Sequence, residues 1–399
     1  MASTRKLAVA SFALLCTISS LGLPLARAET VSRRAEPVPF LDYAGIESAA
    51  SDAVASDLVR RGLADSSAAY AHIARSQNEG RTATPRCRTI EKRKEWRQLN
   101  YWEKKDYMRA IKCLQTKWDY GISPVSNTMY DAFTQVHQTN WTDFHLNAYF
   151  MPWHRWFVWV HAEAMSNLCG YHGPTPYWNY SLDYKKPLES PIFSSDHEVG
   201  FGSHGSKVIN EIGSPGFKVD NGAFANFRVN LPKPHYLTRN FSYWKDSDTD
   251  KAWGYQLGES FSPKQVAIAM QKKTYWDFEM FVDGLNVTNS IGLHNGPHFF
   301  NMGDWNGPGW LQGTEWYPQG STAPNDPMFW PHHAYMDSIF WSWQQKPGRQ
   351  YLFGGSKAFW NLTDDTALPT DKLPFHGLGP DIPVALTLKT ESWPLCYTY

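Results

Sequence analysis

The histidines between residues 137 and 163 are the side chains with the clearest chemical potential, since this stretch holds four of the 14 histidines of the 399-residue chain. His137, His145 and His154 follow at intervals of eight and nine residues. Those intervals turn an α-helix by about 80° and about 180°, so one helix face cannot carry all three. Proline is favoured at the first position of a helix, so Pro152 predicts a new helix with His154 in its opening turns. His145 then lies in the connecting segment and His137 ends the preceding helix. Three imidazoles from three successive elements can converge on one metal ion.

A second group of histidines lies far downstream. His294 and His298 are four residues apart, and His333 follows Asp326-Pro327, a pair typical of a helix N-cap and first turn. His333 is therefore expected about two turns into a helix. Six imidazoles in two sets of three, with no obligatory carboxylate, indicate a pair of metal ions. Imidazole suits Cu, Zn, Fe and Ni, and three protein ligands per ion leave positions open for a small molecule.

Other histidines compete with these on local grounds. His161 lies two helical turns after His154 on nearly the same face, but ~10 Å further along the axis, so it is expected to pack rather than bind. His332 must point ~100° away from His333 and is expected at the rim or behind the ligands. The awkward Gly296-Pro297 pair predicts that the helix carrying His298 starts near the proline. The simpler alternative is that the histidines only pack or cap among aromatic side chains.

Two longer motifs contain these histidines. The first, H-x4-F-x-x-W-H-R, and the second, D-P-x-F-x-x-x-H-x-x-x-D, are formed by His145, Phe150, Trp153, His154 and Arg155, and by Asp326, Pro327, Phe329, His333 and Asp337. Both resemble the copper-binding halves of type-3 copper proteins, which include tyrosinases, catechol oxidases and haemocyanins. The resemblance is closest to short secreted fungal catechol oxidases and tyrosinases, and covers roughly residues 87–399.

The resemblance implies a fold, a cofactor and a ligand set. The expected fold is mainly α, an antiparallel helix bundle with long loops and a few short β-strands. Two copper ions are expected, one held by His137, His145 and His154 and the other by His294, His298 and His333. A catechol would give up two electrons and two protons to become an o-quinone, while O2 is reduced to water. Supporting or catalytic roles are expected for Asn295, Asp283, His332, Phe329 and Asp337.

Three local features refine this expectation. In the family, an asparagine directly after the first histidine of the second site accompanies proton removal from phenols, and Asn295 is at that position. Asp283 falls where similar fungal proteins often have a glutamate thought to hold a water, so the two residues could position a basic water. Monophenol hydroxylation is therefore a hypothesis beside diphenol oxidation. Asp143 replaces a cysteine that is cross-linked to the second histidine in many relatives, so no thioether is expected. Gating residues are expected between Phe299 and Trp310 or near Phe329.

Three other classes of protein share some of these features. A haemocyanin-like oxygen carrier would have the same ligands without turnover, and a zinc hydrolase with three histidine ligands would activate water instead. A non-catalytic secreted glycoprotein would bind no stoichiometric metal. Catechol consumption together with metal analysis distinguishes the three.

The composition is that of a globular protein, and the N-terminal residues indicate secretion. The formal net charge is zero and hydrophobic residues make up 42% of the chain, which favours neither nucleic acid nor a membrane surface as partner. Residues 1–28 have the basic start, apolar run and small-residue cleavage site of a signal peptide. Later segments lack the ~18 apolar residues that a membrane span requires. We therefore expect a secreted monomer or weak homo-oligomer that acts on O2 and a small phenolic substrate.

The cysteines and glycosylation sequons agree with an oxidising compartment. Removal of the signal leaves four cysteines, for which three pairings are possible. We predict Cys87–Cys396, which ties the ends of the domain together, and Cys113–Cys169, which braces the first histidine segment. The five N-x-S/T sequons begin at Asn140, Asn179, Asn240, Asn286 and Asn361.

The remaining organisation follows from composition and periodicity. Residues 29–85 are rich in alanine and serine and predict two helices broken near Gly62, as a pro-segment or an ordinary helical extension. Residues 86–399 are the expected copper catalytic domain. Helices are predicted before residue 118, across residues 126–137 and from Ser262, while residues 170–280 are otherwise expected to form long loops and short strands. Hairpin pieces are expected in residues 340–399, with no large shielding domain after Tyr399.

Overall fold

The computed structural model describes residues 38–61, 86–139, 141–212, 215–241, 258–284, 291–305, 320–359, 361, 363 and 366–399. The predicted signal peptide, the second helix after Gly62, and the sequon residues Asn140 and Asn286 lie outside these ranges. Residues 34–399 form one compact unit, which contains the predicted catalytic domain together with the described residues 38–61 of the segment before it.

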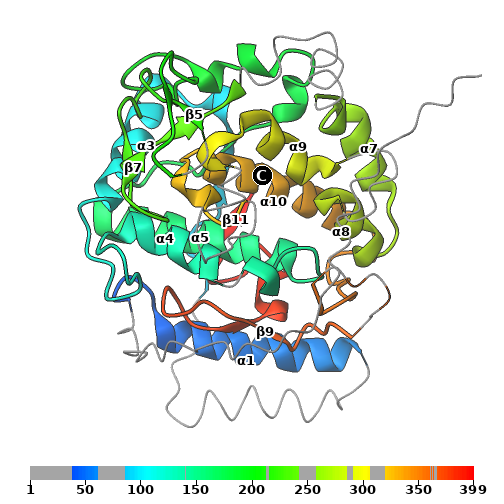
Figure 1. Cartoon of the computed structure of the whole chain (residues 1–399). Coiled ribbons are helices and arrows are strands. Elements are labelled where there is room, and N and C mark those ends of the chain that lie inside the picture. Colours follow the sequence, from blue (N-terminus) through cyan, green and yellow to red (C-terminus); the bar gives the residue numbers. More distant parts are fainter. Residues whose placement is uncertain are drawn as a thin grey trace, which may run out of the picture. The chain divides into compact units, whose positions relative to one another are not determined.

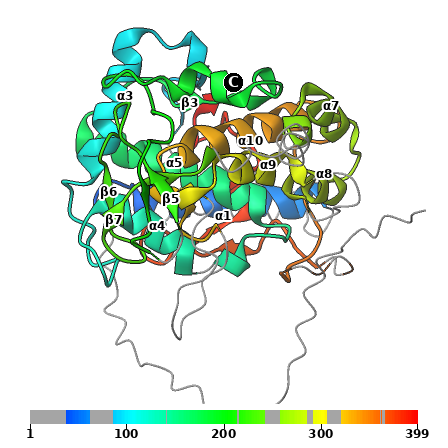
Figure 2. The ribbon, with the colours of Figure 1, turned by 45° about the horizontal axis from the view of Figure 1, so that its top comes forward.

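Four helices form the centre of this unit: α4 (Met129–Thr139), α5 (Phe150–Cys169), α9 (Gly292–Asn301) and α10 (Phe329–Gln344). Figure 1 and Figure 2 show α5 and α10 side by side, with α9 next to α10. Apolar and aromatic residues occupy all faces of α5, as expected for a helix enclosed by protein. The helix ends at Gly170, whose φ of 64° provides the left-handed C-cap that glycine adopts without strain.

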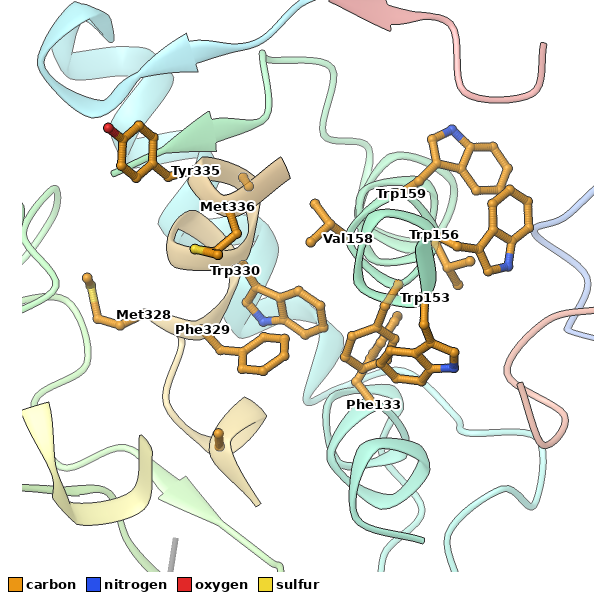
Figure 3. Close-up of a cluster of buried hydrophobic side chains, with 14 of the residues drawn as sticks. Phe133, Trp153, Trp156, Val158, Trp159, Met328, Phe329, Trp330, Tyr335 and Met336 are labelled. Carbon is orange, nitrogen blue, oxygen red and sulfur yellow. The ribbon is translucent and has the colours of Figure 1, made fainter. Parts of the chain in front are cut away.

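Aromatic side chains fill the space between α4, α5 and α10. Figure 3 shows Trp330 and Phe329 of α10 facing Phe133 of α4 and Trp153 of α5. The Trp330 ring lies edge-on to Phe133, with ring centroids 5.3 Å apart. Burial of each such phenylalanine contributes about 1.5–3 kcal/mol to folding. This packing fixes the helices that carry the histidines.

Four further α-helices with described bounds surround the centre. Helix α3 (Tyr101–Leu114) begins with a capping box between Asn100 and Glu103, and packs on α5. The predicted helix from Ser262 is α7 (Pro263–Gln271), and α8 (Tyr275–Asp283) follows it and packs on α9. Helix α1 (Tyr43–Arg60) belongs to the N-terminal segment.

The strands are short and form small separate sheets. Pairing is parallel for β1 (Glu91–Lys92) with β11 (Tyr397–Thr398) and β2 (Lys94–Glu95) with β3 (Pro176–Tyr177). It is antiparallel in the set β4 (Val208–Ile209), β5 (Gly216–Lys218) and β8 (Thr238–Arg239), and in the pairs β6 (Arg228–Val229) with β7 (His235–Tyr236) and β9 (Lys372–Leu373) with β10 (Ile382–Pro383). The prediction of a mainly α fold with few short strands is confirmed.

Both predicted disulfides are present. Cys87–Cys396 joins the segments before β1 and before β11, so it closes the chain of residues 87–396 next to a strand pair. Cys113–Cys169 connects the end of α3 to the end of α5. The second bond therefore braces the helix that carries His154, as its position in the sequence predicts.

Three predicted helix boundaries were wrong, those of α9, α10 and α5. Helix α9 starts at Gly292 rather than near Pro297, which lies inside it. The proline removes one helical hydrogen bond, at a cost of about 3 kcal/mol, and the burial of Leu293 and Phe300 on the same helix offsets this cost. Helix α10 starts at Phe329, after a turn in which the Asp326 carboxylate accepts the N–H of Met328 at 3.0 Å.

The boundary at α10 leaves the prediction for His333 intact, because His333 is the fifth residue of the helix and lies in its second turn. Pro152 is the third residue of α5 rather than the first, and His154 is in the opening turns as predicted. Across the described residues, none of the helices has both the length and the apolar character needed to span a bilayer.

Candidate metal centre

The first three predicted histidines converge. His137 lies near the end of α4, His145 in the bend between the helices and His154 in the second turn of α5. One ring nitrogen of each lies within 4.8 Å of the others, and all three side chains are buried. This geometry can place three nitrogen donors on one metal ion.

The second group contains four histidines rather than three. Ring nitrogens of His294, His298, His332 and His333 all lie within 4.8 Å of one another. His332 is completely buried, so the alternative that places it at the rim of the site was wrong. The reason is that α10 is enclosed on nearly all sides, and the face that His332 occupies packs on Trp305 and Tyr180. His332 therefore lies beside the other three within the same buried cluster.

The two groups face each other. The rings of His154 and His333 stack, with centroids 4.2 Å apart and planes 8° from parallel. The His294 ring lies 6.1 Å from His145 and 6.4 Å from His154. Residues separated by more than 130 positions in the chain therefore form one site that could hold two ions as neighbours.

Hydrogen bonds fix the orientation of five of these rings. In each, Nδ1 faces an oxygen acceptor at 2.7–2.9 Å: Ser321 O for His137, Trp141 O for His145, Phe150 O for His154, Asp283 Oδ1 for His294 and Trp305 O for His298. A carbonyl or carboxylate at Nδ1 requires the proton on that nitrogen, which leaves the lone pair on Nε2.

The free nitrogens show that these residues fit a metal. Within the described part of the chain, Nε2 of His137, His154, His294 and His298 is buried without a hydrogen-bond partner, as are both ring nitrogens of His332 and His333. A buried polar atom without a partner costs about 1–3 kcal/mol, and metal coordination removes that cost. The chemistry of the donor set, neutral imidazole throughout, suits copper.

Burial keeps these imidazoles neutral. Desolvation lowers the pKa of His137 to about 3. The hydrogen bond to the Ser321 carbonyl acts to raise this pKa but offsets the desolvation only in part. Desolvation and the neighbouring rings also hold the pKa values of His145, His154, His298 and His333 well below the ordinary range for histidine. Neutral rings are the form that coordinates a metal ion.

Asp283 and Asn295 lie beside the second group, with contacts that differ from those expected. One Asp283 oxygen accepts from His294 at 2.8 Å and the other accepts from the N–H of Leu146 at 3.0 Å. The Asn295 amide donates to the main-chain carbonyl of Asp283 at 2.8 Å, not to its carboxylate. Asp283 therefore orients His294 and ties it to the residue that follows His145.

The other predicted supporting residues have distinct positions. The Phe329 ring lies 4.1 Å from His333 and 5.1 Å from His137, so it packs on both groups. His161 stacks on Trp330 at 3.6 Å, and the prediction that it packs rather than binds is confirmed. Asp337 belongs to a separate buried network, in which it accepts hydrogen bonds from Arg93, Arg155, Tyr397 and Tyr399.

Several contributors to the site were missed at the sequence level. The carbonyls of Ser321 and Trp305 carry no residue-type signal, since every residue has one. Trp141 also stacks on His145 with centroids 4.7 Å apart. An aromatic residue four positions before a candidate ligand was the available signal for this contact.

These features define a buried dinuclear centre of histidines in a helical core, and comparisons with known proteins identify its class. The chain matches the common central domain of tyrosinase over residues 127–346. The chain belongs to the tyrosinase family of type-3 copper proteins. It is accordingly a copper-dependent oxidoreductase with a dinuclear copper cofactor.

Individual relatives show how far the similarity extends. The tyrosinase-like protein phomQ2 of Diaporthe leptostromiformis is 32% identical over 335 residues, covering 81% of this chain and 75% of that protein. Tyrosinase ustQ of Aspergillus flavus is 32% identical over 326 residues, covering 80% and 82%. A solved polyphenol oxidase variant from Thermothelomyces thermophila has a TM-score of 0.65 at 25% identity, covering 90% of this chain and 99% of that one.

Proposed function

We propose that this enzyme oxidises o-diphenols to o-quinones while O2 is reduced to water. The first copper is assigned to His137, His145 and His154, and the second to His294, His298 and His333. The observation that carries the proposal is the pair of facing histidine groups, in which Nε2 of every member except His145 is buried without a hydrogen-bond partner among the described residues. The family supports a type-3 copper oxidase in general, and similarity to a polyphenol oxidase supports a phenolic substrate.

The chain has two tasks in this chemistry, beside what the bound copper supplies. Bound copper supplies the redox step, because a pair of ions can pass electrons from a phenol to O2. The chain holds the imidazoles in fixed orientations through the carbonyls and the Asp283 carboxylate. Phe329 and the surrounding aromatic rings keep water away from the ligands, and Phe329 packs against both His137 and His333.

Monophenol hydroxylation is a weaker part of the proposal. Asn295 occupies the position that accompanies proton removal in the family, but its amide is engaged with a main-chain carbonyl. Both oxygens of Asp283 already accept hydrogen bonds from protein groups. This arrangement favours a diphenol oxidase whose hydroxylation of simple phenols is slow or absent.

Secretion is also proposed. Residues 1–28 have the pattern of a signal peptide, and two disulfides agree with an oxidising compartment. The described sequon residues, Asn179, Asn240 and Asn361, are all partly exposed. We propose that the secreted protein carries glycans. Mass spectrometry of the secreted chain tests both its start after residue 28 and the presence of sugar.

Turnover and metal content measured on one sample test the proposed activity. Copper-reconstituted protein is expected to contain two copper ions per chain and to consume catechol with O2, whereas tyrosine and tyramine react slowly or not at all. His154→Ala should lose copper and turnover, while His161→Phe, which keeps the stacking on Trp330, should retain both. Two bound copper ions without catechol consumption would favour an oxygen carrier, and stoichiometric zinc with hydrolysis would favour the hydrolase alternative.

A further inference from the structure

His235 is a buried histidine that lies outside both metal-binding groups. It begins β7 and is fully enclosed. Its Nδ1 lies 2.7 Å from the carbonyl of Lys233, and its Nε2 lies 2.6 Å from Asp304 Oδ1. Both partners are acceptors without protons to give, so both ring nitrogens must donate. The ring is therefore an imidazolium paired with a buried carboxylate.

The surroundings of Asp304 favour this ion pair. Its second oxygen accepts the N–H of Thr238 at 2.7 Å and the hydroxyl of the same residue at 2.9 Å. Burial acts to lower the pKa of His235, but the Asp304 carboxylate outweighs it, so the pKa is raised above its ordinary value. Asp304 thus ties the turn η7 (Gly303–Trp305) to β7 and β8.

The residue after Asp304 contacts the metal site directly. The carbonyl of Trp305 accepts the Nδ1 proton of His298 at 2.9 Å, and its ring lies 5.0 Å from His298 and 5.1 Å from His332. Gly303 lies closely against β8, since a Cβ at this position would be 2.3 Å from the carbonyl of Thr238. The position of the carbonyl that orients His298 therefore depends on how Asp304 is held.

The same short segment also holds the other elements of the second group. Arg239 donates to both oxygens of Asp326, at 2.7 and 2.9 Å, just before α10 and its two histidines. The N–H of Asn240 donates to the carbonyl of Asn301 at the end of α9. Residues 235–240 thus connect the end of α9, the turn η7 and the start of α10.

We propose that His235 is a positioning residue for the second copper: by donating to Asp304 it fixes the turn whose Trp305 carbonyl orients His298. This inference rests on the proposed ligand set, because it assigns His298 to the second ion. The first group has its own acceptors in Ser321, Trp141 and Phe150. Loss of the His235 contact should therefore weaken one copper site and spare the other.

Two substitutions separate this role from general stability. His235→Asn keeps an amide donor near the Nδ1 position but cannot reach Asp304, whereas His235→Gln extends a donor toward Asp304. Asp131→Asn is the matched control, since Asp131 is an equally buried carboxylate on α4 held by Ser126, Thr128 and Asn230. Copper per folded chain is measured after equilibrium dialysis at fixed free copper, with thermal unfolding of each apo-protein.

Wild type is expected to bind two copper ions per chain. At a free copper concentration that saturates wild type, His235→Asn should bind one ion. Its affinity for the second ion should be at least tenfold lower than that of wild type. His235→Gln should restore the second ion to within about threefold of wild type, and Asp131→Asn should lower the melting temperature while retaining two ions. Wild type without copper would refute the proposed function itself. Two ions at wild-type affinity in His235→Asn, or equal loss of both ions, would overturn the positioning role. If His235→Asn fails to fold, His235→Gln carries the test: a second copper bound within about threefold of wild type would support the role, and loss of the second ion or of both ions would overturn it.

Discussion

Asp283 links the two halves of the centre through hydrogen bonds. Its carboxylate accepts from His294 of the second group and from the N–H that follows His145 of the first. Groups that hold the distal nitrogen of a ligand histidine typically change metal affinity 10–100-fold when removed. The same carboxylate also keeps the proton on Nδ1 of His294, which leaves the Nε2 lone pair for the metal.

We therefore expect Asp283→Asn to weaken binding of the second copper about 10–100-fold. The amide oxygen can still accept from Leu146, but the amide nitrogen then faces a ring nitrogen that also carries a proton. Copper titration of the apo-protein measures the affinity. Asp277→Asn, an exposed position on the same helix, should bind copper as wild type does, and equal affinities for both variants would contradict the role of Asp283.

Glu279 lies one turn before Asp283 and is fully buried, and neither of its oxygens has a hydrogen-bond partner among the described residues. Desolvation, and secondarily the charge of Asp283, raise the pKa of Glu279 well above its ordinary value of 4.5. The folded state thus keeps a proton that the unfolded state releases above that pH. Below pH 4.5 the glutamate is protonated in both states and does not lower the free energy of unfolding. As pH rises above 4.5, the free energy of unfolding falls by about 1.4 kcal/mol per pH unit until the pKa of the folded state is reached.

Glu279→Gln removes this proton linkage. We expect the variant to be more stable than wild type at pH 7.5, with the difference disappearing toward pH 4.5. Chemical denaturation of the apo-protein at several pH values measures it, with the exposed Glu47→Gln as the control. A stability difference that stays constant across this pH range would show that Glu279 is already ionised in the folded protein.

At the scale of elements, α9 is positioned by close contact rather than by its own helix propensity. It contains Pro297, and a Cβ on Gly296 would lie 2.3 Å from the Ser260 hydroxyl and 2.8 Å from the Phe261 ring. The glycine therefore allows α9 to approach residues 260–261. Because His294 and His298 are on this helix, its displacement would move two ligands together.

Gly296→Ala tests which effect dominates. In an unconstrained helix the change would stabilise by about 1 kcal/mol, but the contact with Ser260 and Phe261 predicts a lower melting temperature and weaker binding of the second copper. Differential scanning calorimetry and copper titration measure both. A raised melting temperature with unchanged copper binding would show that the neighbouring segment yields easily.

Residue types and spacing predicted much of this site and little of its surroundings. The six histidines, the helix start near Pro152 and the N-terminal role of Asp326 follow from local patterns, because each depends on neighbours in sequence. The helix start at Gly292 was missed because Pro297 is tolerated where tertiary packing offsets the lost hydrogen bond. His235 had no signal, since its partner Asp304 lies 69 residues away and neither belongs to a motif.

At the scale of the whole molecule, the segment before the predicted catalytic domain is part of its core. Val38, Leu41 and Ile46 are buried, and α1 packs on β10 and on η9 (Val384–Thr387). Both disulfides of the described cysteines lie within residues 87–396, so neither connects α1 to the rest of the protein. Helix α1 is therefore held in place by its packing. Of the two interpretations of residues 29–85, the burial of residues 38–61 favours a structural extension that stays with the enzyme.

Ile46→Ala tests that preference. Truncation of a fully buried isoleucine costs about 2–5 kcal/mol when its element belongs to the native fold, so the melting temperature of the purified, secreted enzyme should fall. Ser51→Ala, a partly exposed position on the same helix, should remain within about 0.5 kcal/mol of wild type. Mass spectrometry under denaturing and native conditions shows whether residues 38–61 accompany the enzyme. If they are missing from both spectra and Ile46→Ala melts as wild type does, the segment is a removable pro-segment, and the core buried beneath α1 must be stable without it.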